Sequence, residues 1–122
     1  MPRRVAVALI TIGLAVPAVA LAMPKTSPPS QKQRTAILKA FGSRTRAQSD
    51  CMVVLLAASN HKYATVRPHV NHACAKYAFN GTNVFKNTSD NMWKRAFEGS
   101  SYRCPLRNIP VRVQRDLAVC PH

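Results

Sequence analysis

Four cysteines place the strongest constraint on how this chain can fold. They are Cys51, Cys74, Cys104 and Cys120. In an oxidising compartment, four cysteines in a small domain predict two disulfides, each stabilising the fold by about 2–4 kcal/mol. Of the three possible pairings, the short local loop favours Cys104–Cys120, which leaves Cys51–Cys74. Because the cysteines are widely spaced and no Cys-x-x-Cys pair is present, zinc binding is the weaker hypothesis.

The N-terminal segment is typical of a secretory signal peptide. Two arginines open it, an apolar stretch follows over residues 5–16, and Pro17 breaks that stretch. Residues 20–22 (Ala-Leu-Ala) have the small-x-small pattern that signal peptidase accepts, so we expect residues 1–22 to be cleaved off. The alternative is an uncleaved membrane anchor, for which the apolar run is barely long enough. The expected location is therefore outside the cell or at its surface.

The chain beyond the signal peptide is long enough for one domain. Residues 23–30 contain three prolines and two serines, a composition that predicts a flexible or extended leader. We expect residues 31–122 to form a single small disulfide-tied domain.

A capping box predicts the first helix of that domain. Ser30 and Gln33 have the required spacing, and Gly42 provides the stop. The expected helix covers residues 31–41, and a basic, polar connection follows over 43–50. The alternative is that residues 43–50 extend the helix, since only Gly42 interrupts it. Its apolar stripe consists of Ile37, Leu38 and Phe41. At helical spacing such a stripe predicts a face packed on the core, with a membrane-binding face as the less favoured alternative.

After the helix, continuous apolar runs and alternating patterns predict an antiparallel sheet of four to five strands. The expected strands cover residues 51–57, 62–67, 74–79, 82–86 and 92–98. Asn80-Gly81 predicts a type I′ hairpin turn between the third and fourth strands. Pro110 opens a short C-terminal helix that offers Val113 and Leu117 for burial. The fold class is α+β, with the N-terminal helix packed on the sheet. The sheet residues expected beneath the helix are Val54, Leu56, Val66, Tyr77 and Trp93.

The charge balance is the strongest functional signal. The chain has 18 basic and four acidic residues; Arg3 and Arg4 lie in the expected signal peptide, so the remainder carries a net charge of +12. This excess is larger than solubility needs and predicts association with an anionic polymer (cell wall, lipid headgroups or nucleic acid) or with a protein. The candidate polyanion-binding residues are Arg34, Lys39, Arg44, Arg46, Lys94 and Arg95. The alternative is a surface that is merely solvated. We expect a monomer.

Enzymatic chemistry is a second hypothesis. His69 and His72 lie close to Lys76, and two imidazoles with a lysine suffice for acid–base cleavage of RNA. The sequence favours instead two exposed histidines in a turn after Pro68. No Gly-x-Ser-x-Gly elbow or phosphate-binding glycine loop is present, so we assign no catalytic, metal or cofactor site and expect no enzyme. A secreted inhibitor or antibacterial effector is a third hypothesis, for which the sequence shows no reactive-site loop.

A series of short motifs runs through residues 33–120. The motifs are Cys51 with the following strand, Lys62-Tyr63-Ala64-Thr65-Val66, Cys74, Gly81, Trp93-Lys94, Cys104-Pro105, and Pro110 with Val113, Asp116-Leu117 and Cys120. This order resembles a group of small, mostly uncharacterised exported proteins of actinomycete bacteria. That group typically has Trp-Ala-x-Val in the second strand, where this chain has Tyr63. The resemblance implies an exported bacterial α+β domain; it implies no activity and assigns no functional residue.

Overall fold

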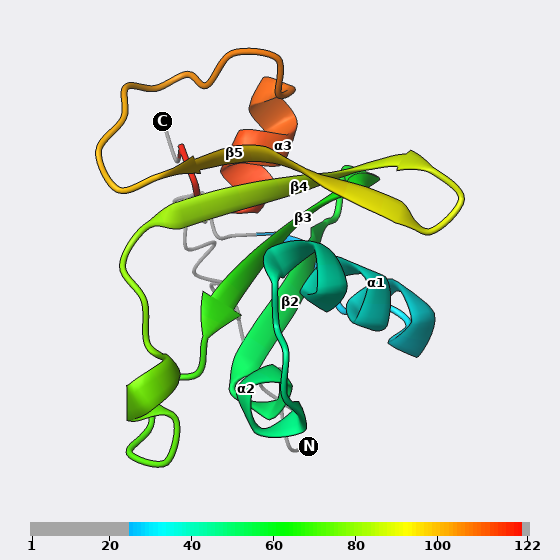
Figure 1. Cartoon of the computed structure of the whole chain (residues 1–122). Helices are drawn as coiled ribbons and strands as arrows, with labels where there is room; N and C mark the ends of the chain where they lie inside the picture. Colours follow the sequence, from blue (N-terminus) through cyan, green and yellow to red (C-terminus); the bar gives the residue numbers. More distant parts are fainter. Residues whose placement is uncertain (1–24, 121–122) are drawn as a thin grey trace, which may run out of the picture.

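A five-stranded antiparallel sheet organises the fold (Figure 1). The structure is a computed structural model that describes residues 25–120, and the expected signal peptide lies outside the described residues. Each strand pairs with its neighbours along the chain, in the order β1-β2-β3-β4-β5. The strands are β1 (Thr26–Ser27), β2 (Met52–Ala57), β3 (Asn60–Pro68), β4 (Thr82–Ser89) and β5 (Met92–Gly99).

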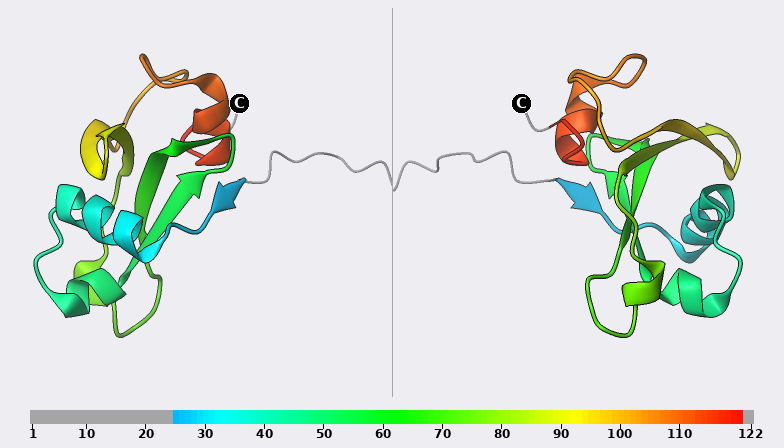
Figure 2. Two further views of the ribbon diagram at one scale, coloured as in Figure 1. Left: turned by 90° about the vertical axis from the view of Figure 1, so that its right-hand side faces the viewer. Right: turned by 60° about the vertical axis from the view of Figure 1, so that its left-hand side comes forward.

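Helices cover both faces of this sheet (Figure 2). They are α1 (Gln31–Phe41), α2 (Arg46–Asp50), the 3₁₀ turn η1 (Ala75–Tyr77) and α3 (Val111–Asp116). The predicted α+β class, with an N-terminal helix on the sheet and a short C-terminal helix, is confirmed. None of the helices within the described residues is long and apolar enough to cross a membrane.

The capping box predicted for the first helix is present. The Ser30 hydroxyl accepts the backbone N–H of Gln33 at 3.1 Å, and the Gln33 side chain accepts the backbone N–H of Ser30 at 2.8 Å. Gly42, with φ 99°, ends α1 in the left-handed conformation that glycine adopts without a Cβ clash. Local sequence therefore fixes both ends of this helix.

Two apolar cores lie on opposite faces of the sheet. The core on the α1 side consists of Ile37, Leu38, Met52, Val54, Leu56, Ala64, Val66, Phe85 and Trp93, with Phe41 and Tyr77 packed at its edge. Four of the sheet residues predicted beneath the first helix belong to this core, whereas the fifth, Tyr77, lies in η1 at its edge and not in the sheet. The core on the α3 side consists of Ala57, Tyr63, Val84, Leu106, Ile109, Val113, Leu117, Val119 and Cys120. The expected burial of Val113 and Leu117 is thus confirmed.

Both disulfide pairings favoured by the sequence are confirmed. Cys51–Cys74 joins the start of β2 to the long connection between β3 and β4, and both of its cysteines are buried. Cys104–Cys120 closes the C-terminal segment around α3. Each disulfide therefore holds a segment with little regular structure against the sheet.

The predicted strand over residues 74–79 is wrong. The segment leaves the sheet because its first residue, Cys74, is bonded to Cys51 at one end of the sheet, and η1 follows directly. The expected hairpin at Asn80-Gly81 is also wrong, although Gly81 has φ 118° and turns the chain into β4. The tight hairpin joins β4 to β5 instead, where Asn91 adopts φ 49°.

Part of the expected leader belongs to the sheet. Thr26 and Ser27 form the edge strand β1, antiparallel to Leu56 and Ala57 of β2. Two prolines follow at residues 28–29, and because proline has no N–H to donate, they end the pairing after two residues. A very short edge strand followed by prolines also limits pairing with other chains.

Candidate functional site

Three of the predicted polyanion-binding residues line one depression. Arg34, Lys39 and Arg46 surround a hollow of about 490 Å³ between α1 and α2. Lys39 and Arg46 are exposed, and Asp50 lies on the same rim. We call this hollow the α1–α2 depression; it combines two exposed cations with one carboxylate.

Arg34 has a structural role in this depression. Its guanidinium donates to the backbone carbonyl oxygen of Ser49 at 2.6 Å and to that of Met52 at 3.2 Å. The side chain is half-buried and ties α1 to the start of β2. Charge-assisted hydrogen bonds of this kind are stronger than neutral ones, so Arg34 serves the fold before any ligand.

The other predicted residues lie elsewhere. Arg44 is exposed on the connection between α1 and α2. Lys94 of β5 is exposed and lies directly opposite Lys86 of β4. Two like charges at opposed positions repel each other and do not stabilise the sheet. Arg95 ion-pairs with Glu98 at 2.9 Å and also donates to the carbonyl oxygen of Phe41 at 3.1 Å.

Acidic residues neutralise little of the positive charge. The single ion pair formed within residues 25–120 is the exposed one between Arg95 and Glu98. Asp116 is buried and accepts the backbone N–H of Ser59 at 2.8 Å, so its carboxylate serves the fold. Most basic side chains of the described chain therefore face solvent without an acidic partner.

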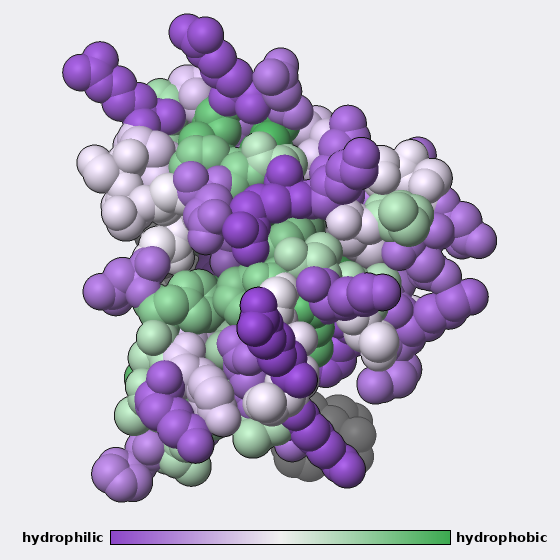
Figure 3. Space-filling view, in the orientation of Figure 1, coloured by the Kyte–Doolittle hydropathy of each residue, from purple (hydrophilic) through white to green (hydrophobic). Residues whose placement is uncertain are grey.

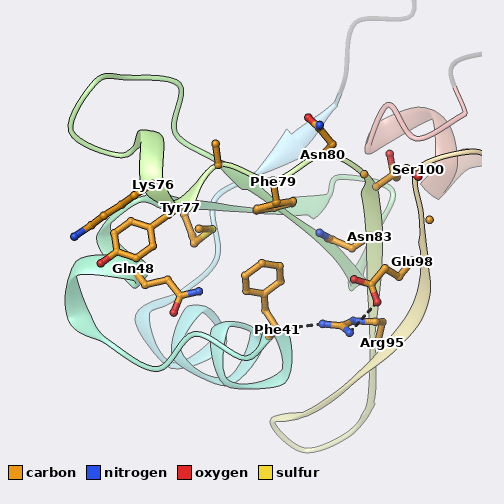
Figure 4. A pocket seen from close by; sticks show the side chains of 15 residues that line it. Phe41, Gln48, Lys76, Tyr77, Phe79, Asn80, Asn83, Arg95, Glu98 and Ser100 are labelled. Carbon is orange, nitrogen blue, oxygen red and sulfur yellow. Dashed lines mark hydrogen bonds and ion pairs between the residues drawn. The ribbon is translucent and has the colours of Figure 1, made fainter.

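A second concave site lies between the C-terminal end of α1, the segment 76–81 and strands β4 and β5 (Figure 4). We call it the aromatic cleft; its volume is about 530 Å³. Its aromatic side chains are Phe41, Tyr77 and Phe79, and its charged ones are Lys76, Arg95 and Glu98. Its side-chain amides include the half-buried Gln48 and the exposed Asn80. Figure 3 shows apolar surface in the middle of this face of the molecule, bordered by hydrophilic side chains.

Asn83 forms part of the cleft wall and holds two strands together. Strands β3 and β4 pair at only two positions, Tyr63↔Lys86 and Ala64↔Phe85. Beyond these positions the buried Asn83 side chain accepts the N–H of Val66 and donates to its carbonyl oxygen, each at 2.8 Å. A side-chain amide thus replaces the backbone ladder where the strands separate.

Sequence reasoning missed Asn83 and a second buried amide, Gln114. Gln114 accepts the N–H of Leu106 at 2.8 Å and donates to the carbonyl oxygens of Leu106 at 2.9 Å and Ile109 at 2.7 Å. The one signal in the sequence is a polar residue next to an apolar one, which also occurs in exposed positions of many strands and helices. Neither amide is available to a ligand, because each is already hydrogen-bonded.

The two histidines of the enzyme hypothesis lie on the connection between β3 and β4. Both His69 and His72 are exposed, and neither lines the aromatic cleft that contains Lys76. The backbone N–H of His69 donates to the carbonyl oxygen of Cys51 at 2.8 Å. Between the histidines, the Val70 side chain is 99% exposed. This loop therefore presents an exposed apolar side chain between two exposed histidines.

Within residues 25–120, no group of three or more histidine, cysteine, aspartate or glutamate side chains is placed to hold a metal ion. The candidate functional regions of the described chain are the α1–α2 depression, the aromatic cleft and the loop after β3. Comparisons with protein-family models, with curated proteins and with solved structures each found no match.

Proposed function

We propose that this chain is an exported, non-enzymatic domain that associates with anionic polymers at or outside the cell surface. One observation carries the proposal: nearly all basic side chains of the described residues lack an acidic partner. The signal-like N-terminus, the two disulfides and the resemblance to exported actinomycete proteins support the location.

The physical basis is counterion release. A polyanion holds a condensed layer of cations, and basic side chains that replace those cations gain the entropy of their release. Isolated cations with no neighbouring carboxylate are the most effective, because they exchange no internal ion pair for the new contact. In the α1–α2 depression Lys39 and Arg46 form no ion pair within the described residues, although Asp50 lies on the same rim.

Binding across a salt series tests the proposal. The oxidised chain from residue 23, which contains all described elements, is titrated with purified cell wall, anionic vesicles and RNA from about 50 to 500 mM salt. We expect affinity for at least one of these to fall by at least about 100-fold between 50 and 200 mM, with log K linear in log salt, as about four or more contacts would produce. The polymer bound most tightly then identifies the source of the anionic groups.

A matched pair of variants tests the site. Lys39→Gln with Arg46→Gln should weaken binding and reduce the salt slope by about two contacts. Lys62→Gln with Arg107→Gln removes the same charge from exposed positions outside the depression and should have the smaller effect on binding.

No binding to any polymer would contradict the proposal. Cleavage of the RNA, abolished by His69→Ala or His72→Ala, would support the enzyme hypothesis instead.

A second candidate function, inhibition of a secreted protease, is favoured by the loop after β3. Both ends of this loop are attached to Cys51, one by the hydrogen bond from His69 and the other by the disulfide to Cys74. Between them Val70 is almost fully exposed. A loop fixed before binding loses little entropy on docking, and an exposed valine fits a small apolar specificity pocket.

An inhibition assay tests this candidate. The oxidised chain should inhibit a serine protease with a small apolar specificity pocket, and Val70→Asp should weaken inhibition at least tenfold, because a carboxylate is poorly accommodated there. Val111→Asp is the control, since Val111 is 49% exposed and lies on α3. Absence of inhibition, or equal loss in both variants, would exclude a role for this loop.

A further inference from the structure

We infer that the aromatic cleft binds a sugar unit of an anionic glycan. This inference rests on the proposed association with anionic polymers and narrows the polymer to a glycan. The cleft has the concave form and the volume, about 530 Å³, of sites that hold a small molecule or one unit of a polymer. Its lining combines aromatic rings, side-chain amides and both signs of charge, and each part matches one feature of such a sugar.

The aromatic part provides an apolar platform. Phe41 and Phe79 lie with ring centroids 5.3 Å apart and planes tilted by 42°, so they present a ridge of ring edges and faces. Both rings and Tyr77 are half-buried, which leaves part of each accessible from the cleft. The C–H faces of a pyranose ring are apolar and pack on such surfaces.

The polar part surrounds that platform. The exposed Asn80 amide offers donors and an acceptor. The Gln48 amide oxygen already accepts the backbone N–H of Arg44 at 3.1 Å, so Gln48 offers its N–H donors, and the Glu98 carboxylate offers acceptors only. Sugar hydroxyls both donate and accept, so they match this mixture. In Figure 4, Lys76 and the Arg95–Glu98 pair lie at opposite ends of the cleft, with Phe41 and Phe79 between them. A hydroxyl-bearing ring over the phenyl groups would have its anionic substituent near one of the two cations.

Glu98 favours a glycan over a nucleic acid or a lipid headgroup. It is one of only four acidic residues in the chain, and it lines this cleft. A carboxylate repels the anionic groups of any polymer, but it also accepts hydrogen bonds from hydroxyls, which a sugar unit carries on several carbons and polyphosphate lacks. A site built for phosphates alone would be expected to lack it.

Removal of Glu98 therefore has opposite effects on the two kinds of polymer. The side chain is 62% exposed and contacts Arg95 alone among charged groups of the described chain, so Glu98→Ala should fold. We expect Glu98→Ala to weaken binding of polygalacturonate about fivefold, by loss of hydroxyl contacts, and to tighten binding of polyphosphate and single-stranded RNA, by loss of repulsion. All titrations use one fixed salt concentration.

Asp90→Ala is the matched control. Asp90 is exposed in the turn between β4 and β5 and does not line the cleft, yet its removal changes the net charge equally. This variant should tighten binding of all three polymers. Addition of a galacturonate oligomer should also shift the side-chain amide NMR signals of Gln48 and Asn80, and addition of polyphosphate should not.

The outcomes separate the inference from the proposed function. If Glu98→Ala tightens binding of polygalacturonate as Asp90→Ala does, the polymer senses net charge alone; the glycan site is then excluded while polyanion association stands. If RNA shifts the amide signals and polygalacturonate does not, the cleft binds nucleic acid and the inference is wrong. If none of the polymers binds, the proposed function itself fails.

Discussion

At the scale of single residues, buried amides decide where the sheet separates. Asn83 supplies both hydrogen bonds that Val66 would receive from a paired strand, and the Thr65 hydroxyl also donates to the Asn83 backbone carbonyl at 2.8 Å. An unpaired buried backbone group costs about 1–3 kcal/mol, so one side chain prevents a loss of several kcal/mol at this point. The same residue forms part of the wall of the aromatic cleft.

Replacement of Asn83 tests this role. Asn83→Leu keeps the volume and leaves the N–H and carbonyl of Val66 unpaired, so we expect the free energy of unfolding to fall by about 2–4 kcal/mol in urea denaturation. Asn80→Leu, at an exposed position three residues earlier, should change it by about 0.5 kcal/mol or less. Equal stability of the two variants would show that the amide is dispensable.

Arg34 shows why charge alone does not identify a ligand-binding residue. Its position in a basic run predicts contact with a polyanion, whereas the structure gives its guanidinium two carbonyl partners, 15 and 18 residues further along the chain. No local pattern reveals partners at that distance. The exposed Lys39 of the same helix has no such role and remains the better candidate.

At the scale of elements, the sequence predicts a helix or strand correctly where residues close to its two ends determine where it begins and stops. Helix α1 begins and ends as predicted because its capping box and Gly42 act within a few residues. The predicted strand over 74–79 is wrong because the disulfide to Cys51 holds this segment away from any strand that it needs as a partner. Edge strand β1 was not expected, because two residues beside prolines show no strand pattern until β2 lies next to them.

At the scale of the whole molecule, the positive charge opposes folding. Like charges distributed over a small domain repel one another, and the pairing of Lys86 with Lys94 adds a local repulsion within the sheet. Two disulfides and two cores offset this repulsion. Salt shortens the range of the repulsion to about 10 Å at 0.1 M.

Salt should therefore stabilise the isolated domain. We expect Tm to rise by about 3–8 °C between about 10 and 300 mM sodium chloride, because screening removes the repulsion. Lys94→Glu converts the pair with Lys86 into an attractive one and should reduce this rise. A Tm that falls with salt, measured by calorimetry, would contradict the view that repulsion dominates the electrostatics of the fold.

The sequence by itself determined the α+β class, the first helix and the basic character, because caps, periodicity and composition act locally or need no partner. It favoured the observed disulfide pairing through one short loop, and the structure decided among the three possible pairings. The tertiary structure alone decided which basic side chains are used by the fold, where buried amides replace the backbone ladder, and which aromatic rings meet beside Arg95 and Glu98. These features depend on groups far apart in the chain, and their proximity is set by packing and by the Cys51–Cys74 disulfide.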